Sequence, residues 1–396
     1  MKILGKVAHV ILPLGIPIAW KQLTADYKRL ATAIVGVAFG IMLMLFQMGL
    51  YNAINAMVVL PHAALRGDLF LTSRDWEFLG SNRGFTRRRL SQVEALPEIA
   101  SAAPLYVGYV DWTNPETRKS KVALTLAFDP SRNPFKPGAV TDQVERLRDP
   151  EAVLFDVLSP ADYGRMAYLL RLGNGTVDAD ISRKHAVVKG LFPMGATLSA
   201  SGNLVMSDEA WFRYRSDLPR NMANVGVIAL RPGADPETTA AKLRTLLPND
   251  VRVVTRDVFI AEEQRYWNER TPVGFVVGAG MAVGMLVGAI VVYQILHSDV
   301  DDHLKEYATL KAIGLGNLFF TFLVLEEALI LVVLGTLPAL LLTGLLNYYA
   351  RTSGNLRAYL EPIQVSWVLL AVSATALIAG YLATRKLRSA DPASVF

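Results

Sequence analysis

The densest group of side chains that could do chemistry lies in one short polar run. It contains His297, Asp299, Asp301, Asp302 and His303. Imidazole and carboxylate groups are common metal ligands, but this spacing does not by itself bring the five side chains around one ion. We therefore interpret the run as a solvated polar segment at the end of a helix and predict no metal site.

Two more carboxylates, Glu326 and Glu327, lie inside an apolar run. A proton-coupled carrier needs ionisable groups of this kind within its membrane spans. Adjacent residues on a helix point about 100° apart, so at most one of the two can face a given helix interface. We favour a structural position at the inner membrane boundary over a proton relay.

Motifs for nucleotide binding and hydrolysis are missing from the sequence. It contains no G-x-x-x-x-G-K-[ST], no G-x-S-x-G and no H-E-x-x-H. The absence of cysteine excludes thiol catalysis, disulfides and cysteine-ligated metals. We expect a non-catalytic chain without a directly bound cofactor, so any work with ATP and Mg²⁺ belongs to a partner.

The composition indicates an integral membrane protein. Of 396 residues 52% are hydrophobic and only 19% are charged, and the mean hydropathy is +0.31. Charges reach ordinary soluble density only between residues 60 and 270, where acidic and basic residues are nearly balanced. That balance argues against a nucleic-acid partner.

Four apolar runs are long enough to cross a bilayer. Basic residues precede the first run and follow the last, so the positive-inside rule places both termini in the cytoplasm. We expect the first helix to end at Pro61, because proline lacks the N–H that an interior helical position donates. The predicted segments, in order, are a cytoplasmic amphipathic segment (1–29), a first transmembrane helix with a stalk (30–59), an extracytoplasmic domain (60–270), a second transmembrane helix (271–297), a cytoplasmic loop or helix (298–317), a third transmembrane helix (318–346), a short outer loop (347–364), a fourth transmembrane helix (365–384) and a cytoplasmic tail (385–396).

The predicted extracytoplasmic domain is of the α+β class and could comprise two lobes. Short β-type runs alternate with turn signals, and fewer stretches have helical spacing. The 141–166 region and the 173–180 turn are expected insertion points. The expected strands are 68–72, 105–112, 121–128, 152–156, 186–189, 204–206, 225–230 and 251–254, and the expected helices are 87–95, 209–215 and 235–247.

The second transmembrane run is rich in glycine at helical spacing. Pairs in the G-x-x-x-G pattern permit close helix approach, so we expect packing against the first span or against a second copy of the chain. Ordinary membrane-helix composition is the alternative. The glycines are Gly274, Gly278, Gly280, Gly284 and Gly288.

The segment after this run carries an apolar strip. Leu304, Tyr307, Leu310 and Ile313 recur every three residues, and polar residues lie beside them. Such a strip can rest in a groove of a partner or on lipid.

Four stretches together resemble one branch of a known permease group. WKQLTADYKRL (20–30), YWNERTPVGF (266–275), VVYQILHSDVDDHLKEYATLKAIG (291–314) and ADPASVF (390–396) resemble DevC, the permease of DevBCA-type exporters within the MacB/FtsX group. The likeness extends over essentially the whole chain and is weakest in the periplasmic domain.

The resemblance implies a homodimer in the bacterial inner membrane with a MacB-like periplasmic core domain. It implies two copies of a separate ABC ATPase, a periplasmic membrane-fusion adaptor, an outer-membrane tunnel protein, and export of a lipid-like or glycolipid substrate by mechanotransmission. It also implies that one segment contacts the ATPase. Those ATPase-coupling residues are His303, Leu304, Glu306, Tyr307, Leu310, Lys311, Ile313 and Gly314. The alternatives within the group are an FtsX-type regulator of an envelope hydrolase and a lipoprotein-releasing permease.

Overall fold

The structure is a computed structural model of the whole chain, and it describes residues 18–312, 314–354 and 358–384. The chain divides into two compact units. Residues 1–53 and 274–396 form the helical unit, and residues 54–273 form the α/β unit. Each unit is described separately below. The expected terminal segments 1–17 and 385–396 lie outside the described residues.

Among its described residues, the helical unit contains four helices that are long and apolar enough to span a membrane. The first belongs to this unit up to residue 53, and two shorter helices are also described there. The helices are α2 (Ile18–Ala25), α3 (Tyr27–Ala64), α9 (Pro272–Asp302), α10 (Leu304–Ala312), α11 (Asn317–Gly354) and α12 (Pro362–Ala383). The candidate spans are Tyr27–Ala64, Pro272–Asp302, Asn317–Thr352 and Pro362–Ala383, so the third helix extends well beyond its expected end at residue 346.

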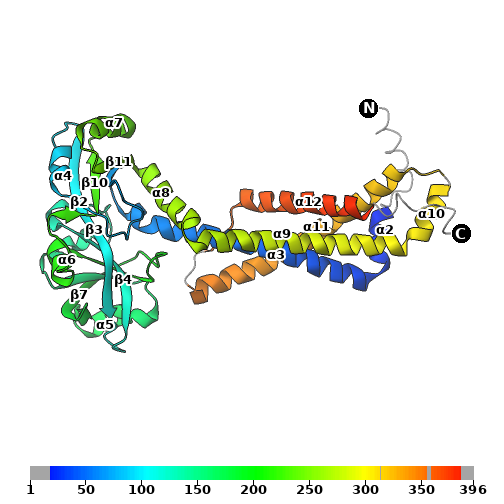
Figure 1. Cartoon of the computed structure of the whole chain (residues 1–396). Helices are drawn as coiled ribbons and strands as arrows, with labels where there is room; N and C mark the ends of the chain where they lie inside the picture. The colour runs from blue at the N-terminus through cyan, green and yellow to red at the C-terminus, as the bar shows by residue number, and fades with distance from the viewer. Residues whose placement is uncertain (1–17, 313, 355–357, 385–396) are drawn as a thin grey trace. The chain divides into compact units, whose positions relative to one another are not determined.

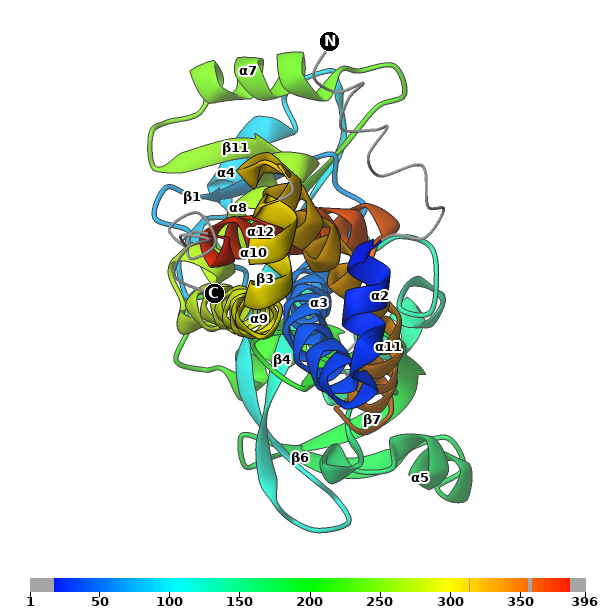
Figure 2. The same ribbon diagram turned by 90° about the vertical axis from the view of Figure 1, so that its right-hand side faces the viewer.

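Within the helical unit, α3 packs between α9 and α11, as the view along the helices also shows (Figure 2). A Cβ atom added to Gly40 of α3 would lie 2.8 Å from the Cα of Gly288 in α9. A Cβ added to Gly335 of α11 would lie 2.9 Å from the Cγ1 of Val37 in α3. These small residues let the helix backbones approach closely, which is how apolar helices gain packing energy in lipid.

A pair of amides joins α3 to α12. The side chains of Asn52 and Gln364 exchange hydrogen bonds, with Nδ2 of Asn52 donating at 2.5 Å and Nε2 of Gln364 donating at 2.9 Å. Asn52 also donates to the carbonyl of Tyr359 at 3.0 Å. Each polar group therefore has a partner where water is scarce, as a buried amide requires.

The α/β unit begins with the last turns of α3, and here the sequence expectation is wrong. The helix does not end at Pro61 but continues to Ala64. The last carbonyl groups of a helix have no N–H partner within the helix and need donors from elsewhere. The guanidinium of Arg256 donates to the carbonyls of His62 at 3.3 Å and Leu65 at 2.8 Å, and this positive charge also suits the helix C-terminus.

One nine-stranded sheet dominates the α/β unit, in the order β11-β1-β10-β3-β4-β8-β5-β7-β6. The β4–β8 and β5–β7 pairs are parallel and the other pairs are antiparallel. The strands are β1 (Leu69–Ser73), β3 (Ile99–Thr113), β4 (Ser120–Phe128), β5 (Ala152–Asp156), β6 (Val177–Ile181), β7 (Lys184–Phe192), β8 (Gly202–Ser207), β10 (Val225–Leu230) and β11 (Val251–Thr255), with β2 (Phe85–Thr86) and β9 (Met222–Ala223) forming a small second sheet.

The fifteen-residue strand β3 joins the part of the sheet formed by β11, β1 and β10 directly to β6 at the opposite end. It pairs with β10 near its start and with β6 at Trp112 and Thr113 near its end. Figure 1 shows α4 and α7 near one end of the sheet and α5 near the other. The two expected lobes are therefore parts of one continuous sheet. The helices of the unit are α4 (Arg88–Val93), α5 (Met166–Leu172), α6 (Asp208–Tyr214), α7 (Pro236–Leu246) and α8 (Arg256–Glu269), with 3₁₀ turns at Pro130–Arg132, Thr141–Arg148 and Ala161–Tyr163.

Both faces of the sheet are covered by apolar cores. Leu69 and Leu71 of β1 face one core, whereas Phe70 between them faces the other. Alternate residues of a strand point to opposite faces, so a strand that is buried on both sides reads as a continuous apolar run. This pattern explains why β1, β5 and β10 can be predicted from their sequences.

Five helices and strands of the α/β unit were missed: β6, α5, α8 and the two short strands β2 and β9. The expected turn at residues 173–180 overlaps β6, whose sequence VDADI carries two aspartates. Aspartate is depleted in strands, so these residues weaken the strand signal. The helices α5 and α8 were also not expected, and the expected insertion at residues 141–166 includes the buried strand β5.

Candidate functional site

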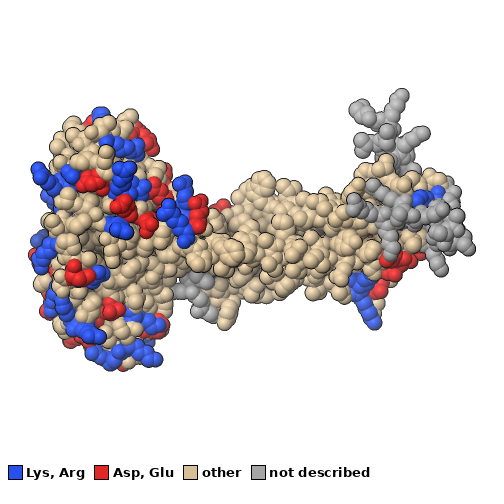
Figure 3. All heavy atoms as spheres, viewed as in Figure 1, with Lys and Arg blue, Asp and Glu red and all other residues tan. Residues whose placement is uncertain are grey.

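The polar residues singled out in the sequence gather at one end of the helical unit. This end is formed by α2, the start of α3, the end of α9, α10 and the start of α11 (Figure 1). In the space-filling view the helical unit is almost free of charged atoms along its length, and blue and red atoms gather near this end (Figure 3). We refer to Gln22, Arg29, Asp299, Asp302, His303 and Tyr307 as the polar cluster.

Arg29 is the central cation of the polar cluster. Its guanidinium forms an ion pair with Asp302 and lies 3.9 Å from Oδ1 of Asp299. It also donates to the backbone carbonyl of Ile295 at 3.2 Å. An arginine that bonds both a carboxylate and a main-chain carbonyl holds two helices in one geometry. Arg29 therefore fastens the start of α3 to the end of α9.

Asp299 corrects the interpretation of this run as solvated, because its side chain is only 6% exposed. The Nδ1 atom of His303 lies 3.0 Å from the carbonyl oxygen of Asp299 and 3.7 Å from its Oδ1. By contrast, His297 stacks on Tyr293 with ring centroids 5.5 Å apart. Among residues 18–312, 314–354 and 358–384, no three His, Asp or Glu side chains are placed to hold a metal ion.

Tyr307 connects α10 to both α2 and α11. Its hydroxyl oxygen accepts a hydrogen bond from Nε2 of Gln22 at 3.1 Å. Its ring meets that of Phe320 edge-on, with centroids 5.3 Å apart. The side chain is 2% exposed, and this burial, together with the nearby carboxylates of Glu327 and Asp299, raises the pKa of the Tyr307 hydroxyl. The residue thus stays a neutral hydrogen-bonding anchor.

The expected apolar strip therefore faces the chain's own core. Leu304 and Leu310 are partly buried and pack against the same hydrophobic cluster as Tyr307. This is a correction for Tyr307, which was expected at a partner surface and lies inside the helical unit. Ile313 lies outside the described residues.

Among the residues of α10 whose burial is described, Glu306 and Thr309 are exposed. Gly314, just after the helix, is exposed as well. The N–H of Gly314 donates to the carbonyl of Lys311 at 3.1 Å, and that of Leu315 donates to the carbonyl of Leu310 at 3.2 Å. Gly314 has φ +105°, a backbone conformation that glycine adopts without strain at a helix C-terminus. Gly314 therefore sets the turn from α10 into α11.

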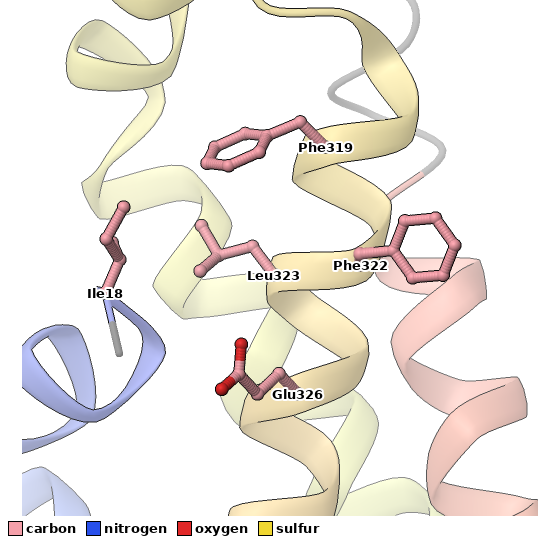
Figure 4. Close-up of a pocket in the computed structure, with 5 residues that line it drawn as sticks. All are labelled: Ile18, Phe319, Phe322, Leu323 and Glu326. Atoms are coloured by element: carbon pink, nitrogen blue, oxygen red, sulfur yellow. The ribbon is translucent and has the colours of Figure 1, made fainter. Parts of the chain in front are cut away.

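The two adjacent glutamates of α11 have different surroundings. Glu327 is 0% exposed, and neither of its carboxylate oxygens has a hydrogen-bond partner among the described residues. Glu326 is half-buried and lines a small hollow with Ile18, Phe319, Phe322 and Leu323 (Figure 4). As expected from helix geometry, only one of the pair points into the helix interface.

Three of the five glycines in α9 lie against α3. Added Cβ atoms would lie 2.2 Å from Nε2 of Gln47 at Gly280 and 3.0 Å from Cγ of Met44 at Gly284. Gly288 faces Gly40. A Cβ at Gly278 would meet nothing within 4 Å, so that glycine lies on an open face. Gly274 is half-buried near the start of α9.

The sequence interpretation missed Gln22, Arg29 and Phe320 as members of this site. A usable signal existed for Arg29. It directly precedes the long charge-free run of α3, and Asp299 and Asp302 directly follow the charge-free run of α9. Charges at the same boundary of two antiparallel membrane helices lie at the same depth, where opposite signs can pair. The arrangement is one of ion pairs and packed rings, which is suited to holding helices together.

Two family descriptions match consecutive parts of the chain. The MacB-like periplasmic core domain matches residues 30–246, and the FtsX-like permease C-terminal matches residues 278–392. No curated protein sequence matches the chain significantly.

Solved structures give weaker likenesses. The periplasmic region of MacB from Actinobacillus actinomycetemcomitans has 9% identity and a TM-score of 0.33, covering 49% of this chain and 91% of that one. The extracellular domain of the noncanonic ABC-type transporter YknZ from Gram-positive bacteria has 10% identity and a TM-score of 0.32, with coverages of 48% and 99%. A domain of a permease protein from Porphyromonas gingivalis has 15% identity and a TM-score of 0.30, with coverages of 51% and 97%.

The two family matches together account for both units and for their order along the chain. The first includes most of the α/β unit, and the second includes α10, α11, α12 and most of α9. Four apolar helices and a domain of the periplasmic type complete the agreement. The chain belongs to the MacB-like periplasmic core domain family and, with its FtsX-like permease region, is an ABC permease-type membrane protein.

Proposed function

We propose that the chain is the permease subunit of an ATP-driven tripartite exporter of the DevBCA type. In this proposal two copies of the chain bind two copies of a separate ABC ATPase, which uses ATP and Mg²⁺. A periplasmic membrane-fusion adaptor and an outer-membrane tunnel protein complete the assembly. Support comes from the family, because MacB- and FtsX-type permeases work with ABC ATPase partners.

The observation that carries the proposal is the attachment of α10. This helix is nine residues long, and its buried Tyr307 bonds α2 and packs on α11. A short helix attached in this way cannot move without moving the start of α11. Because packed interfaces shift between discrete arrangements instead of deforming smoothly, a push on α10 would be passed to the spanning helices.

The polar cluster would act as the second attachment. The ion pair between Arg29 and Asp302 fastens α3 to the end of α9, one residue before His303 and two before α10 begins. Motion of α10 would therefore reach α9 through the chain and α3 through the ion pair. In the proposed cycle this motion expels a lipid-like or glycolipid substrate from the periplasmic side, with both termini in the cytoplasm and the membrane being the bacterial inner membrane.

The proposed contact with the ATPase uses the outward face of α10 and its turn, including Glu306 and Gly314. Among the other expected coupling residues, Leu304 and Leu310 are partly buried and pack against the hydrophobic cluster of the helical unit, and His303 lies against the carbonyl of Asp299. Lys311 lies in the last turn of α10. A polar face suits a contact that must form and separate in each cycle. Charged residues at the rim of an interface mainly change the rate of association and bury little apolar surface.

A charge reversal tests the proposal. The chain is co-expressed with a candidate ABC ATPase that carries a Walker-A motif, and the complex is purified and assayed for ATP hydrolysis. We expect Glu306→Lys to lower co-purified ATPase by about tenfold, a change typical of one reversed charge at an interface. The matched control is Glu237→Lys, a reversal on the exposed surface of α7, which should leave the yield unchanged.

The outcomes separate the competing functions. If wild-type chain purifies without any ATPase, the exporter proposal is wrong. If the α/β unit captures an envelope hydrolase and no adaptor, a regulatory role of the FtsX type replaces it. If a second, different permease co-purifies in equal amount, the lipoprotein-releasing type replaces it.

A further inference from the structure

The α/β unit contains a cavity of about 350 Å³ beside the end of α3. Three segments enclose it: the last turns of α3, the loop 135–140, and residues 192–194 at the end of β7. Its volume lies within the range of pockets that hold small organic ligands, roughly 300–1,000 Å³.

The floor of the cavity is apolar. Phe135, Val140, Phe192 and Met194 line it, and each is at least nine-tenths buried in one core of the sheet. Leu60 adds a further apolar side chain from α3. A sugar or nucleotide would need several donors and acceptors on this floor, whereas a hydrocarbon chain needs only apolar contact.

The mouth of the cavity carries one charge. Lys136 is the only charged residue among the twelve that line the cavity, and its side chain is exposed. Within the described part of the chain, the Lys136 ammonium forms no ion pair. A single cation at the rim of an apolar cavity complements a ligand with one anionic end and one hydrocarbon end.

The walls are held in place without a ligand. The N–H of Lys136 donates to the carbonyl of Ala64 at 2.9 Å, which ties the loop to α3. The amide of Gln143 donates to the carbonyls of Ala139 at 2.6 Å and Leu191 at 2.8 Å, which ties the loop to β7. A preformed cavity loses little conformational entropy when it binds.

We propose that this cavity binds a single-chain anionic amphiphile, with the alkyl chain on the apolar floor and the anionic headgroup at Lys136. The inference rests on the proposed function, because it names a binding site and a chemical class for the lipid-like cargo of the exporter.

The test uses the full chain in nanodiscs of phosphatidylcholine. The probe is palmitate with a diazirine on its alkyl chain, and the uncharged comparison is hexadecanol with the same diazirine. After irradiation, peptides containing residues 135–140 and 192–194 are quantified by mass spectrometry. Labelling of α12 serves as the internal reference, because any membrane-dissolved probe reaches an apolar span.

Two variants fill the cavity and one removes its charge. Ala63→Trp and Ala139→Trp place a large ring in the cavity and should each lower palmitate labelling of the two peptides by at least about fivefold. Lys136→Glu should lower labelling by palmitate by about fivefold and leave labelling by the alcohol unchanged. The matched controls are Ala241→Trp and Lys119→Glu, at exposed positions that do not line the cavity, and both should label like wild type.

Equal palmitate labelling of the two cavity peptides in wild type and all three cavity variants would overturn the inference. Stronger labelling of these peptides in wild type by hexadecanol than by palmitate would overturn it as well. This result is distinguishable from failure of the proposed function, because ATPase co-purification is measured on the same preparations. Loss of the ATPase with cavity labelling intact contradicts the exporter alone. Co-purified ATPase without cavity labelling contradicts the cavity alone.

Discussion

The side chain of Gln22 donates a hydrogen bond to the hydroxyl oxygen of Tyr307 at 3.1 Å, across 285 positions of sequence. The two residues belong to the short helices α2 and α10, neither of which is a candidate membrane span. Through the Phe320 ring, Tyr307 also reaches α11. One buried side chain therefore links two short helices to a membrane helix.

This link predicts different effects for two substitutions of Tyr307. Tyr307→Phe keeps the ring and removes one hydrogen bond, which contributes about 1 kcal/mol net, so coupled ATP hydrolysis should fall by no more than about fivefold. Tyr307→Ala also removes the ring, at a cost of about 3–5 kcal/mol. Hydrolysis by the purified complex should then fall at least about tenfold.

Membrane insertion of both Tyr307 variants is checked by alkaline extraction and should match wild type. Similar losses for the two variants would mean that the hydrogen bond, and not the ring packing, transmits motion.

A second prediction concerns the close approach of α3 and α9. A Cβ atom at Gly40 would lie 2.8 Å from the Cα of Gly288, and backbone cannot move aside cheaply. Gly40→Val should destabilise the protein by about 1–3 kcal/mol and lower the thermal midpoint in detergent, measured by tryptophan fluorescence.

Gly278→Val is the matched control, because a Cβ there meets nothing within 4 Å. A lower midpoint for this variant as well would show that Gly278 is covered, for example by a second copy of the chain.

A third prediction concerns a buried pair in the α/β unit. The Nε2 atom of His62 lies 3.6 Å from Oε2 of Glu263, and the two side chains are 1% and 5% exposed. The Glu263 carboxylate accepts from the N–H of Leu79 at 2.7 Å and from the indole of Trp267 at 3.0 Å. Nδ1 of His62 lies 3.0 Å from the carbonyl of Val58, which can only accept, so Nδ1 carries the proton there.

Glu263→Ala leaves these buried donors without an acceptor. Each buried donor left without a partner costs about 1–3 kcal/mol, so the urea concentration at which the α/β unit becomes protease-sensitive should fall. The exposed Glu269 of the same helix provides the control, since Glu269→Ala removes an equal charge. An unchanged midpoint for Glu263→Ala would show that the pair does not stabilise the fold.

A fourth prediction is a pH effect at His185 on β7. The Asp178 carboxylate, 3.1 Å from Nε2, raises the pKa of His185 above its ordinary value of 6.5, and Glu151 contributes from the other side. Because this pKa is raised by folding, the stabilisation is complete below about pH 6.5 and is lost as the pH rises through the folded value. A titration followed by NMR of ¹³C-labelled histidine should show this raised pKa.

His185→Gln identifies the resonance, and Asp178→Asn should shift its pKa downward. A His185 resonance that titrates at the ordinary value in wild type and is unaffected by Asp178→Asn would contradict the prediction.

The sequence by itself determined where the spans lie and much of the sheet. Charge-free runs predict spans because every residue in lipid faces the same solvent, so burial needs no tertiary information. Strands such as β5 and β10 are predictable for a related reason, since both of their faces are buried and their apolar runs are continuous. The DevC-type resemblance and the roles that follow from it remain predictions.

The tertiary structure decided which side of each element meets which neighbour. The apolar strip of α10 predicts a buried face, but the sequence does not say whether a partner or the chain itself covers it. Tyr307 is covered by residues far away in sequence, and the same is true of Asp299 and Glu263. Long-range packing also extended α3 past Pro61, because Arg256 supplies the donors that the end of the helix lacks. The local sequence pattern determines which side chains must be buried, and only the tertiary structure determines which neighbouring residues bury them.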